Sequence, residues 1–222
     1  MTRVGFIGLG NVGGKLAGSL LRNGVDLFVR DLDRAAAQPF LDEGAHWGES
    51  PRAMAENCDI VITCLPSPAA SAVVMEADDG ILAGLSDGKI WAEMSTTDEA
   101  EVTRLGAMVA ATGAAAVDCP VSGGCHRAAT GNIAILAGCD RAVFDRILPV
   151  LTVLGRRVLH TGPLGTASKL KVMTNYLATA NLVTLCEALV TCKASGLDLN
   201  TTYEAIRISS GNSFVHETES QV

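Results

Sequence analysis

The sequence predicts an α/β protein, in which a doubly wound parallel sheet is followed by an all-helical C-terminal segment. Short apolar runs that alternate with helical stretches are the first observation, because this alternation is typical of parallel strands joined by helices. A glycine-rich turn directly after the first apolar run is the second. The third is a change to long helical periodicity, which predicts a first domain over residues 1–162 and a second over residues 163–222.

Seven apolar runs are predicted strands, and the last two are expected to extend the sheet: Arg3–Ile7, Asp26–Val29, Ile60–Cys64, Lys89–Ala92, Ala115–Cys119, Asn132–Ala137 and Arg157–His160. Helices are expected to begin near Asn11, Asp33, Ala69 and Thr97, and a further helix to cover about residues 141–154. Helices of this kind between parallel strands cover both faces of the sheet.

The second domain is predicted to contain one long helix, over about residues 167–195, which Gly196 ends. A shorter helix is expected over about residues 200–209. Polar residues such as Lys169 and Glu187 make the long helix too polar for a membrane span. Two helices bury little surface by themselves, so we expect either further C-terminal helices or a core that another subunit completes.

Composition narrows the class of protein. A chain of 222 residues with 48% hydrophobic residues can bury a substantial core. The formal charge of −7, without a cluster of basic residues, argues against a nucleic-acid partner. The first residues lack a signal-peptide pattern, so a cytoplasmic location is expected. Seven cysteines without a C-x-x-C motif favour reduced thiols, and no metal site is predicted.

The glycine-rich turn is a G-x-G-x-x-G motif formed by Gly8, Leu9, Gly10, Asn11, Val12 and Gly13. Gly8 allows the tight turn, Gly10 lets a pyrophosphate approach the backbone, and Gly13 lets the next helix pack closely. Asp31 follows the second strand, where a carboxylate accepts hydrogen bonds from the adenosine ribose. The motif and the carboxylate together predict a Rossmann-type dinucleotide-binding domain.

The same carboxylate predicts which dinucleotide binds. Asp31 would repel a 2′-phosphate, so NAD is expected and NADP is the less favoured cofactor. Arg30 and Arg34 flank this carboxylate, and either could reach a 2′-phosphate. We favour the interpretation that both arginines are solvated.

Lys171 and Asn175 are the best candidates for chemistry on the substrate. They lie at positions i and i+4 of the long helix, so they share one helix face. Apolar neighbours would partly desolvate Lys171 and lower its pKa toward the range of a general acid or base. Lys169, which lies on another face, is predicted to be an ordinary solvated lysine.

Two further segments follow predicted strands. Ser122, Gly123 and Gly124 lie in an expected flexible turn whose N–H groups and hydroxyl could bind a substrate carboxylate. Ser95, Thr96 and Thr97 could either cap the next helix or place a hydroxyl against the nicotinamide ribose.

Together these segments resemble the beta-hydroxyacid dehydrogenase family. The resemblance rests on five motifs in order: residues 5–13, Leu65-Pro66, Ser95-Thr96, residues 118–124, and residues 162–165 leading to Lys171 and Asn175. It implies that Lys171 is the catalytic acid/base and that Asn175 orients the substrate. It also implies that Ser122, Gly123 and Gly124 bind the substrate carboxylate, and that Leu65, Pro66 and Thr96 line the cofactor site.

The implied activity is NAD-dependent interconversion of a short beta-hydroxy acid and its semialdehyde or keto form. Thr174-Asn175 replaces the usual asparagine pair, which affects the expected substrate more than the chemistry. Two alternatives stay open: a non-catalytic NAD-sensing module, and an imine reductase-like enzyme, whose relatives usually replace the lysine. A homodimer or homotetramer is expected, because the faces of the long apolar helix need covering.

Overall fold

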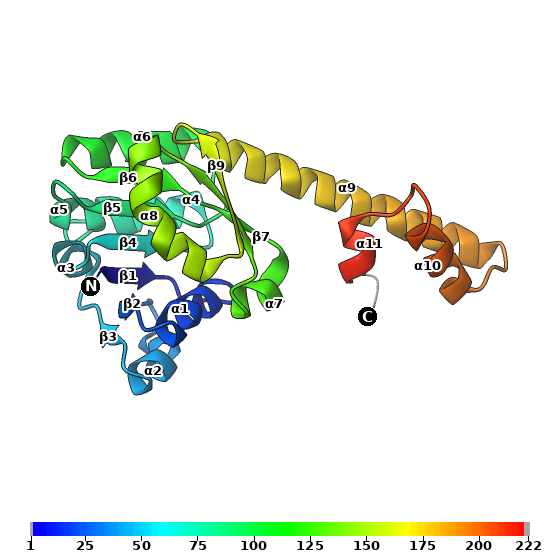
Figure 1. Cartoon of the computed structure of the whole chain (residues 1–222), viewed down its shortest axis with the longest axis horizontal. Helices are drawn as coiled ribbons and strands as arrows, with labels where there is room; N and C mark the ends of the chain where they lie inside the picture. The colour runs from blue at the N-terminus through cyan, green and yellow to red at the C-terminus, as the bar shows by residue number, and fades with distance from the viewer. Residues whose placement is uncertain (1, 220–222) are drawn as a thin grey trace. The chain divides into compact units, whose positions relative to one another are not determined.

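The computed structural model describes residues 2–219 and divides into two compact units, Met1–Lys171 and Val172–Val222. The first unit contains a sheet of nine strands (Figure 1): β1 (Arg3–Ile7), β2 (Asp26–Arg30), β3 (His46–Trp47), β4 (Ile60–Thr63), β5 (Ile90–Glu93), β6 (Ala115–Asp118), β7 (Val121–Ser122), β8 (Ala134–Gly138) and β9 (Arg157–Gly162). Their order is β3-β2-β1-β4-β5-β6-β8-β7, with β9 paired to β8. This order confirms the doubly wound prediction.

The sheet is parallel from β3 to β6 but not beyond. The last two predicted strands extend the sheet as expected, but β8 runs antiparallel to both β6 and β7, whereas β9 is parallel to β8. The cause is the connection between β6 and β8. It contains β7 and the six-residue helix α7 (Gly124–Ala129), and β7 pairs with β8, so the chain turns back beside the sheet instead of crossing over one of its faces as a parallel connection does.

The other helices of the first unit are α1 (Gly13–Arg22), α2 (Arg34–Asp42), α3 (Pro51–Asn57), α4 (Pro68–Glu76), α5 (Ile81–Gly84), α6 (Glu99–Ala111) and α8 (Arg141–Leu154). The helix α9 (Thr166–Ala194) begins in this unit and continues in the second, which also holds α10 (Leu199–Arg207) and α11 (Phe214–Glu219). Sequence patterns missed β3, β7, α3, α5, α7 and α11. These elements have two to seven residues, too few to display a period.

The strands are apolar on both faces because helices cover both. Phe6 and Ile62 pack with α1 and α8, whereas the alternate residues Ile7, Val61 and Trp91 pack with α3, α5 and α6. Successive strand residues therefore enter two separate cores, as the period of two requires. Burial on both sides makes the sheet a rigid base for the loops that leave its carboxyl edge.

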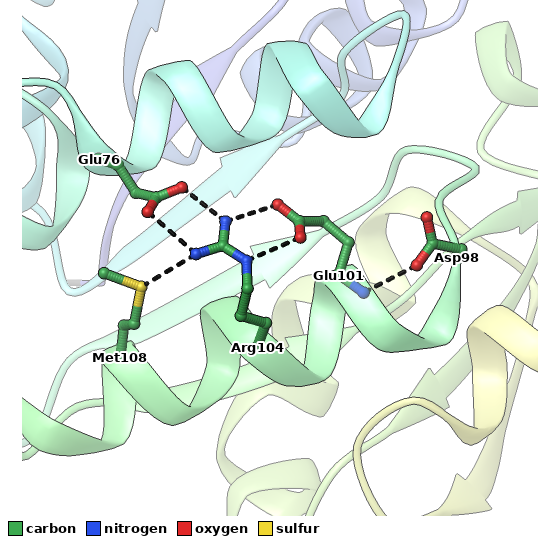
Figure 2. Close-up of polar contacts among 5 residues, drawn as sticks. All are labelled: Glu76, Asp98, Glu101, Arg104 and Met108. Atoms are coloured by element: carbon green, nitrogen blue, oxygen red, sulfur yellow. Dashed lines mark hydrogen bonds and ion pairs between the residues drawn. The ribbon is translucent and has the colours of Figure 1, made fainter.

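The helices α4 and α6 follow two of the predicted cofactor segments, and one arginine joins them (Figure 2). Arg104 on α6 pairs with Glu76 at the end of α4, at 2.6 Å, and with Glu101, at 2.7 Å. Asp98 caps α6 by accepting a hydrogen bond from the Glu101 amide at 2.8 Å. Of the two alternatives for Ser95, Thr96 and Thr97, the helix cap is therefore wrong, and these residues precede the helix.

The short helices of the second unit are held by a helix cap and by an aromatic contact. Asp198 caps α10 through the Thr201 amide, and His216 of α11 lies on Tyr203, with ring centroids 4.4 Å apart. By length and composition alone α9 would also suit a membrane span, with a mean hydropathy of 1.3 over its most apolar 18 residues, of which 6% are buried. The predictions that α9 is not a span and that copies of the chain associate stay predictions.

Candidate active site

The predicted cofactor residues of the first unit lie at one edge of the sheet. β1, β2, β4 and β5 are parallel, and their carboxyl ends are Ile7, Arg30, Thr63 and Glu93. Each predicted cofactor residue follows one of these ends. The strand order reverses direction between β1 and β4, and in open α/β sheets ligands bind at such a switch point. The fold therefore places the glycine turn and the Leu65 segment on either side of this point.

The glycine turn between β1 and α1 has the shape that a pyrophosphate needs. Gly8 has a φ of +99°, and a Cβ there would overlap the Cys64 carbonyl oxygen. A Cβ on Gly13 would overlap the Gly8 carbonyl oxygen, whereas a Cβ on Gly10 would meet nothing within 4 Å. Gly10 thus faces open space, and α1 starts without a side-chain cap. Both features fit a phosphate bound at the helix N-terminus.

Asp31 and the glycine turn are in direct contact. The Leu9 amide donates to Asp31 Oδ2 at 2.6 Å, and the Asp33 amide donates to Oδ1 at 3.1 Å. The carboxylate is thereby fixed at the end of β2 while it remains partly exposed. This arrangement fits a ribose held by Asp31 beside a pyrophosphate held by the turn.

The two flanking arginines have partners on the protein. The Arg30 guanidinium donates to the carbonyl oxygens of Gly48 and Glu49, each at 2.7 Å. The Arg34 guanidinium lies 4.8 Å from the centre of the Trp47 ring. Arg30 therefore joins β2 to the segment after β3, and it is not simply solvated as expected.

Leu65 and the Ser95 segment are joined by a buried network. The Leu65 amide donates to Ser95 Oγ at 2.7 Å, and the Ser95 amide donates to Glu93 Oε1 at 2.8 Å. The strands that precede these segments are also joined, because the Trp91 indole on β5 donates to Thr63 Oγ1 on β4. Thr96 and Pro66 follow these anchored positions and are exposed, so they are available to a cofactor.

Glu93 is 1% exposed, and burial raises its pKa above the ordinary 4.5. The folded protein thus holds a proton that the unfolded chain releases above pH 4.5, so this residue makes stability fall as the pH rises. We expect Glu93→Gln to remove that fall, which can reach about 1.4 kcal/mol per pH unit. Urea unfolding at pH 5 and pH 8 measures it, with exposed Glu43→Gln as the control. An unchanged pH dependence in Glu93→Gln would contradict a raised pKa.

The predicted carboxylate-binding segment begins with a short strand. Val121 and Ser122 form β7 against β8, and Gly123 and Gly124 have φ values of +128° and +81°. The expected flexible turn is therefore a short strand followed by two glycines with left-handed φ, which only glycine adopts readily. Ser122 is partly exposed and Gly124 exposed.

The two lysines at the start of α9 differ as predicted. Lys171 is 8% exposed, and desolvation lowers its pKa from the ordinary 10.5. Lys169 is exposed and pairs with Glu99 at 2.6 Å. Asn175 lies four residues after Lys171 in the same helix, within the second unit, and is exposed.

Asp118 has a place in this site that the sequence analysis did not assign. It ends β6 and is fully buried, and its carboxylate accepts hydrogen bonds from the Gly165 and Ser168 amides at the start of α9. No local pattern signals this contact, because the partners are 47 and 50 residues away.

Comparison with known proteins decides the family. Residues 3–162 match the NAD binding domain of 6-phosphogluconate dehydrogenase, and residues 165–221 match the NAD-binding domain of NADP-dependent 3-hydroxyisobutyrate dehydrogenase. The chain is 35% identical to 2-(hydroxymethyl)glutarate dehydrogenase of Eubacterium barkeri, over 98% of this chain and 72% of that protein. The chain belongs to the beta-hydroxyacid dehydrogenase family.

Other members of the beta-hydroxyacid dehydrogenase family agree. NAD-dependent L-serine dehydrogenase of Pseudomonas aeruginosa is 32% identical, over 98% of this chain and 73% of that protein. The structure of Mycobacterium tuberculosis 3-hydroxyisobutyrate dehydrogenase with L-serine has a TM-score of 0.92 and 26% identity, over 100% of this chain and 75% of that one. The family supports an NAD-dependent hydroxyacid dehydrogenase activity and confirms NAD as the predicted cofactor.

Proposed function

We propose that this dehydrogenase interconverts a short beta-hydroxy acid and its semialdehyde or keto form, with Lys171 as the general acid/base. The observation that carries the proposal is the contrast between two neighbouring lysines. Lys171 is buried with a lowered pKa, whereas Lys169 is exposed and paired with Glu99. A lysine that loses its proton more easily is suited to accept the hydroxyl proton of a substrate.

In the proposed reaction, each group of predicted site residues has a separate role. During oxidation, neutral Lys171 takes the hydroxyl proton, and in the reverse direction protonated Lys171 returns it to the carbonyl oxygen. Ser122, Gly123 and Gly124 bind the substrate carboxylate, and Asn175 orients the substrate. The glycine turn and Asp31 would hold the dinucleotide, and Leu65, Pro66 and Thr96 would line its site. When bound, NAD supplies the acceptor of the hydride.

NAD is proposed as the preferred dinucleotide over NADP. The Asp31 carboxylate stands where a 2′-phosphate would be repelled. Arg30 donates to two backbone carbonyl oxygens, and Arg34 lies over Trp47. Both arginines already have partners, which supports NAD.

The proposed substrates carry a carboxylate, and they carry a hydroxyl on the carbon that is beta to it. The names of two relatives support this class, because L-serine and 2-(hydroxymethyl)glutarate both have a hydroxymethyl group on the carbon next to a carboxylate. Sulfonate analogues belong in the same test, since N–H donors that bind a carboxylate also bind a sulfonate.

A substrate panel tests the proposal. The chain is incubated with NAD and short acids that carry a hydroxymethyl or secondary hydroxyl group on the beta carbon, together with sulfonate analogues, and NADH is followed by absorbance. We expect turnover of at least one member, and none with analogues that lack the hydroxyl. If no acid of the panel is oxidised while NAD still binds, the result would favour the NAD-sensing alternative.

A further inference from the structure

The start of α9 is held by a carboxylate from a distant strand. The Gly165 amide donates to Asp118 Oδ1 at 2.9 Å, and the Ser168 amide donates to Oδ2 at 2.7 Å. Amides in the first turn of a helix have no partner within the helix, so a side chain must satisfy them when they are buried. Asp118 does so from the end of β6, and both of its oxygens are used.

The pocket around this carboxylate is closely fitted. Asp118 is fully buried, and a Cβ on Gly138 of the neighbouring strand β8 would overlap its Oδ1 atom. Burial raises the pKa of Asp118, and the bonds from Gly165 and Ser168 oppose this effect. The carboxylate therefore has one position, set by β8 on one side and by the helix start on the other.

Asp118 also connects the two segments that would contact the substrate. Lys171 is three residues after Ser168, less than one helical turn away. Ser122 is four residues after Asp118, in β7. All four residues belong to the first compact unit. A shift of the helix start would move Lys171 while Ser122 stayed on its strand.

We propose that Asp118 is a positioning residue, which fixes Lys171 at the distance from the bound hydroxyl that proton transfer requires. The inference rests on the proposed role of Lys171. Asp118 is fully buried and both of its oxygens accept from backbone amides, so we assign it the holding of the helix and no contact with the substrate. A displacement of about 1 Å in a reacting group can slow an enzyme about 100-fold, so even a small shift of the helix start has a large kinetic effect.

Two variants disturb this contact from opposite sides. Asp118→Asn keeps the size of the side chain but replaces one acceptor oxygen with an amino group, so one of the two amides loses its partner. Gly138→Ala leaves Asp118 intact and pushes a methyl group against Oδ1, and the same methyl group also presses on the Pro163 carbonyl oxygen and Thr166 Oγ1 at the helix start. Asp198→Asn is the control for a general loss of helix capping, because Asp198 caps α10 through the nearby Thr201 amide and no predicted site residue lies on that helix.

Each variant of the full chain is assayed with the substrate found for the wild type, and kcat is divided by the number of NAD-binding sites. We expect both Asp118→Asn and Gly138→Ala to lower kcat 10- to 100-fold, while the Kd for NAD changes less than twofold. The primary deuterium isotope effect on kcat, with substrate labelled at the carbon that bears the hydroxyl, should rise. Asp198→Asn should leave kcat and the isotope effect unchanged.

Three results would overturn the proposal: a wild-type kcat per NAD site in Asp118→Asn, an unchanged isotope effect, or an equal loss in Asp198→Asn. Should Asp118→Asn fail to fold, Gly138→Ala still tests whether a displaced start of α9 lowers kcat, which the positioning of Lys171 requires. Lys171→Ala separates this inference from the proposed function. If Lys171→Ala is inactive and Asp118→Asn is fully active, only the positioning role fails, whereas an active Lys171→Ala refutes the proposed function itself.

Discussion

Replacing Lys171 by alanine should lower kcat/KM by about 100- to 10,000-fold, the usual contribution of a general acid or base. NAD affinity should stay near its wild-type value, because the predicted dinucleotide contacts are in the glycine turn and Asp31, which bind each other. Steady-state kinetics and calorimetric titration with NAD measure the two effects. Lys169→Ala is the control, since that lysine is two residues away and pairs with Glu99 at the surface.

The pH dependence gives a second check on the same residue. Lys171 acts as a base only when neutral, so kcat/KM for oxidation should rise with pH and level off above the pKa of Lys171. Desolvation lowers that pKa, so the midpoint of the rise should lie below pH 10.5. The rise should be missing from the residual activity of Lys171→Ala. Turnover by Lys171→Ala within tenfold of the wild type would contradict the role as acid/base.

Replacing Asp31 by alanine should weaken NAD binding by about 10- to 150-fold. A hydrogen bond to a charged group contributes about 1.5–3 kcal/mol, and the ribose hydroxyls would lose such a partner. The Leu9 amide would also lose its acceptor, so the glycine turn would be less well fixed. NADP should be affected much less, because the repulsion of its 2′-phosphate disappears together with the carboxylate.

Titration of the chain with NAD and with NADP, by calorimetry or fluorescence, measures this change in preference. Asp26→Ala is a matched control, because Asp26 begins the same strand and pairs with Arg3 at the opposite edge of the sheet. It should leave both affinities unchanged. An equal loss for the two dinucleotides in Asp31→Ala would show that the carboxylate does not discriminate between them.

The parts of the fold that the sequence predicts are those with local signals. Gly8, Gly13 and Asp31 belong to a motif of fixed spacing, and the long strands and helices display their periods over many residues. The direction of β8 could not be predicted, because it depends on how short β7 and α7 turn the chain. The sequence distinguishes Lys171 from Lys169 only through the apolar residues beside Lys171, which predict partial desolvation. The buried position of Lys171 agrees with this prediction.

The site contacts that the sequence did not predict are long-range. Ser95 was expected near a helix cap or a ribose, yet its hydroxyl accepts from the Leu65 amide, 30 residues away. Arg30 was expected in solvent, yet it donates to carbonyl oxygens of the segment that follows the neighbouring strand β3. Such contacts depend on which strands become neighbours in the sheet, and the order of the strands cannot be seen directly in a single sequence.

The capping of α9 by Asp118 bears on where this chain can be divided. The family match to the first domain stops at residue 162, but the compact unit continues to Lys171. A fragment cut at residue 162 would retain Asp118 and lose both amides that bind it. Its carboxylate would then be buried without these partners, or the end of β6 would open to water. During synthesis, too, the end of β6 must await residues made 50 positions later before its contacts are complete.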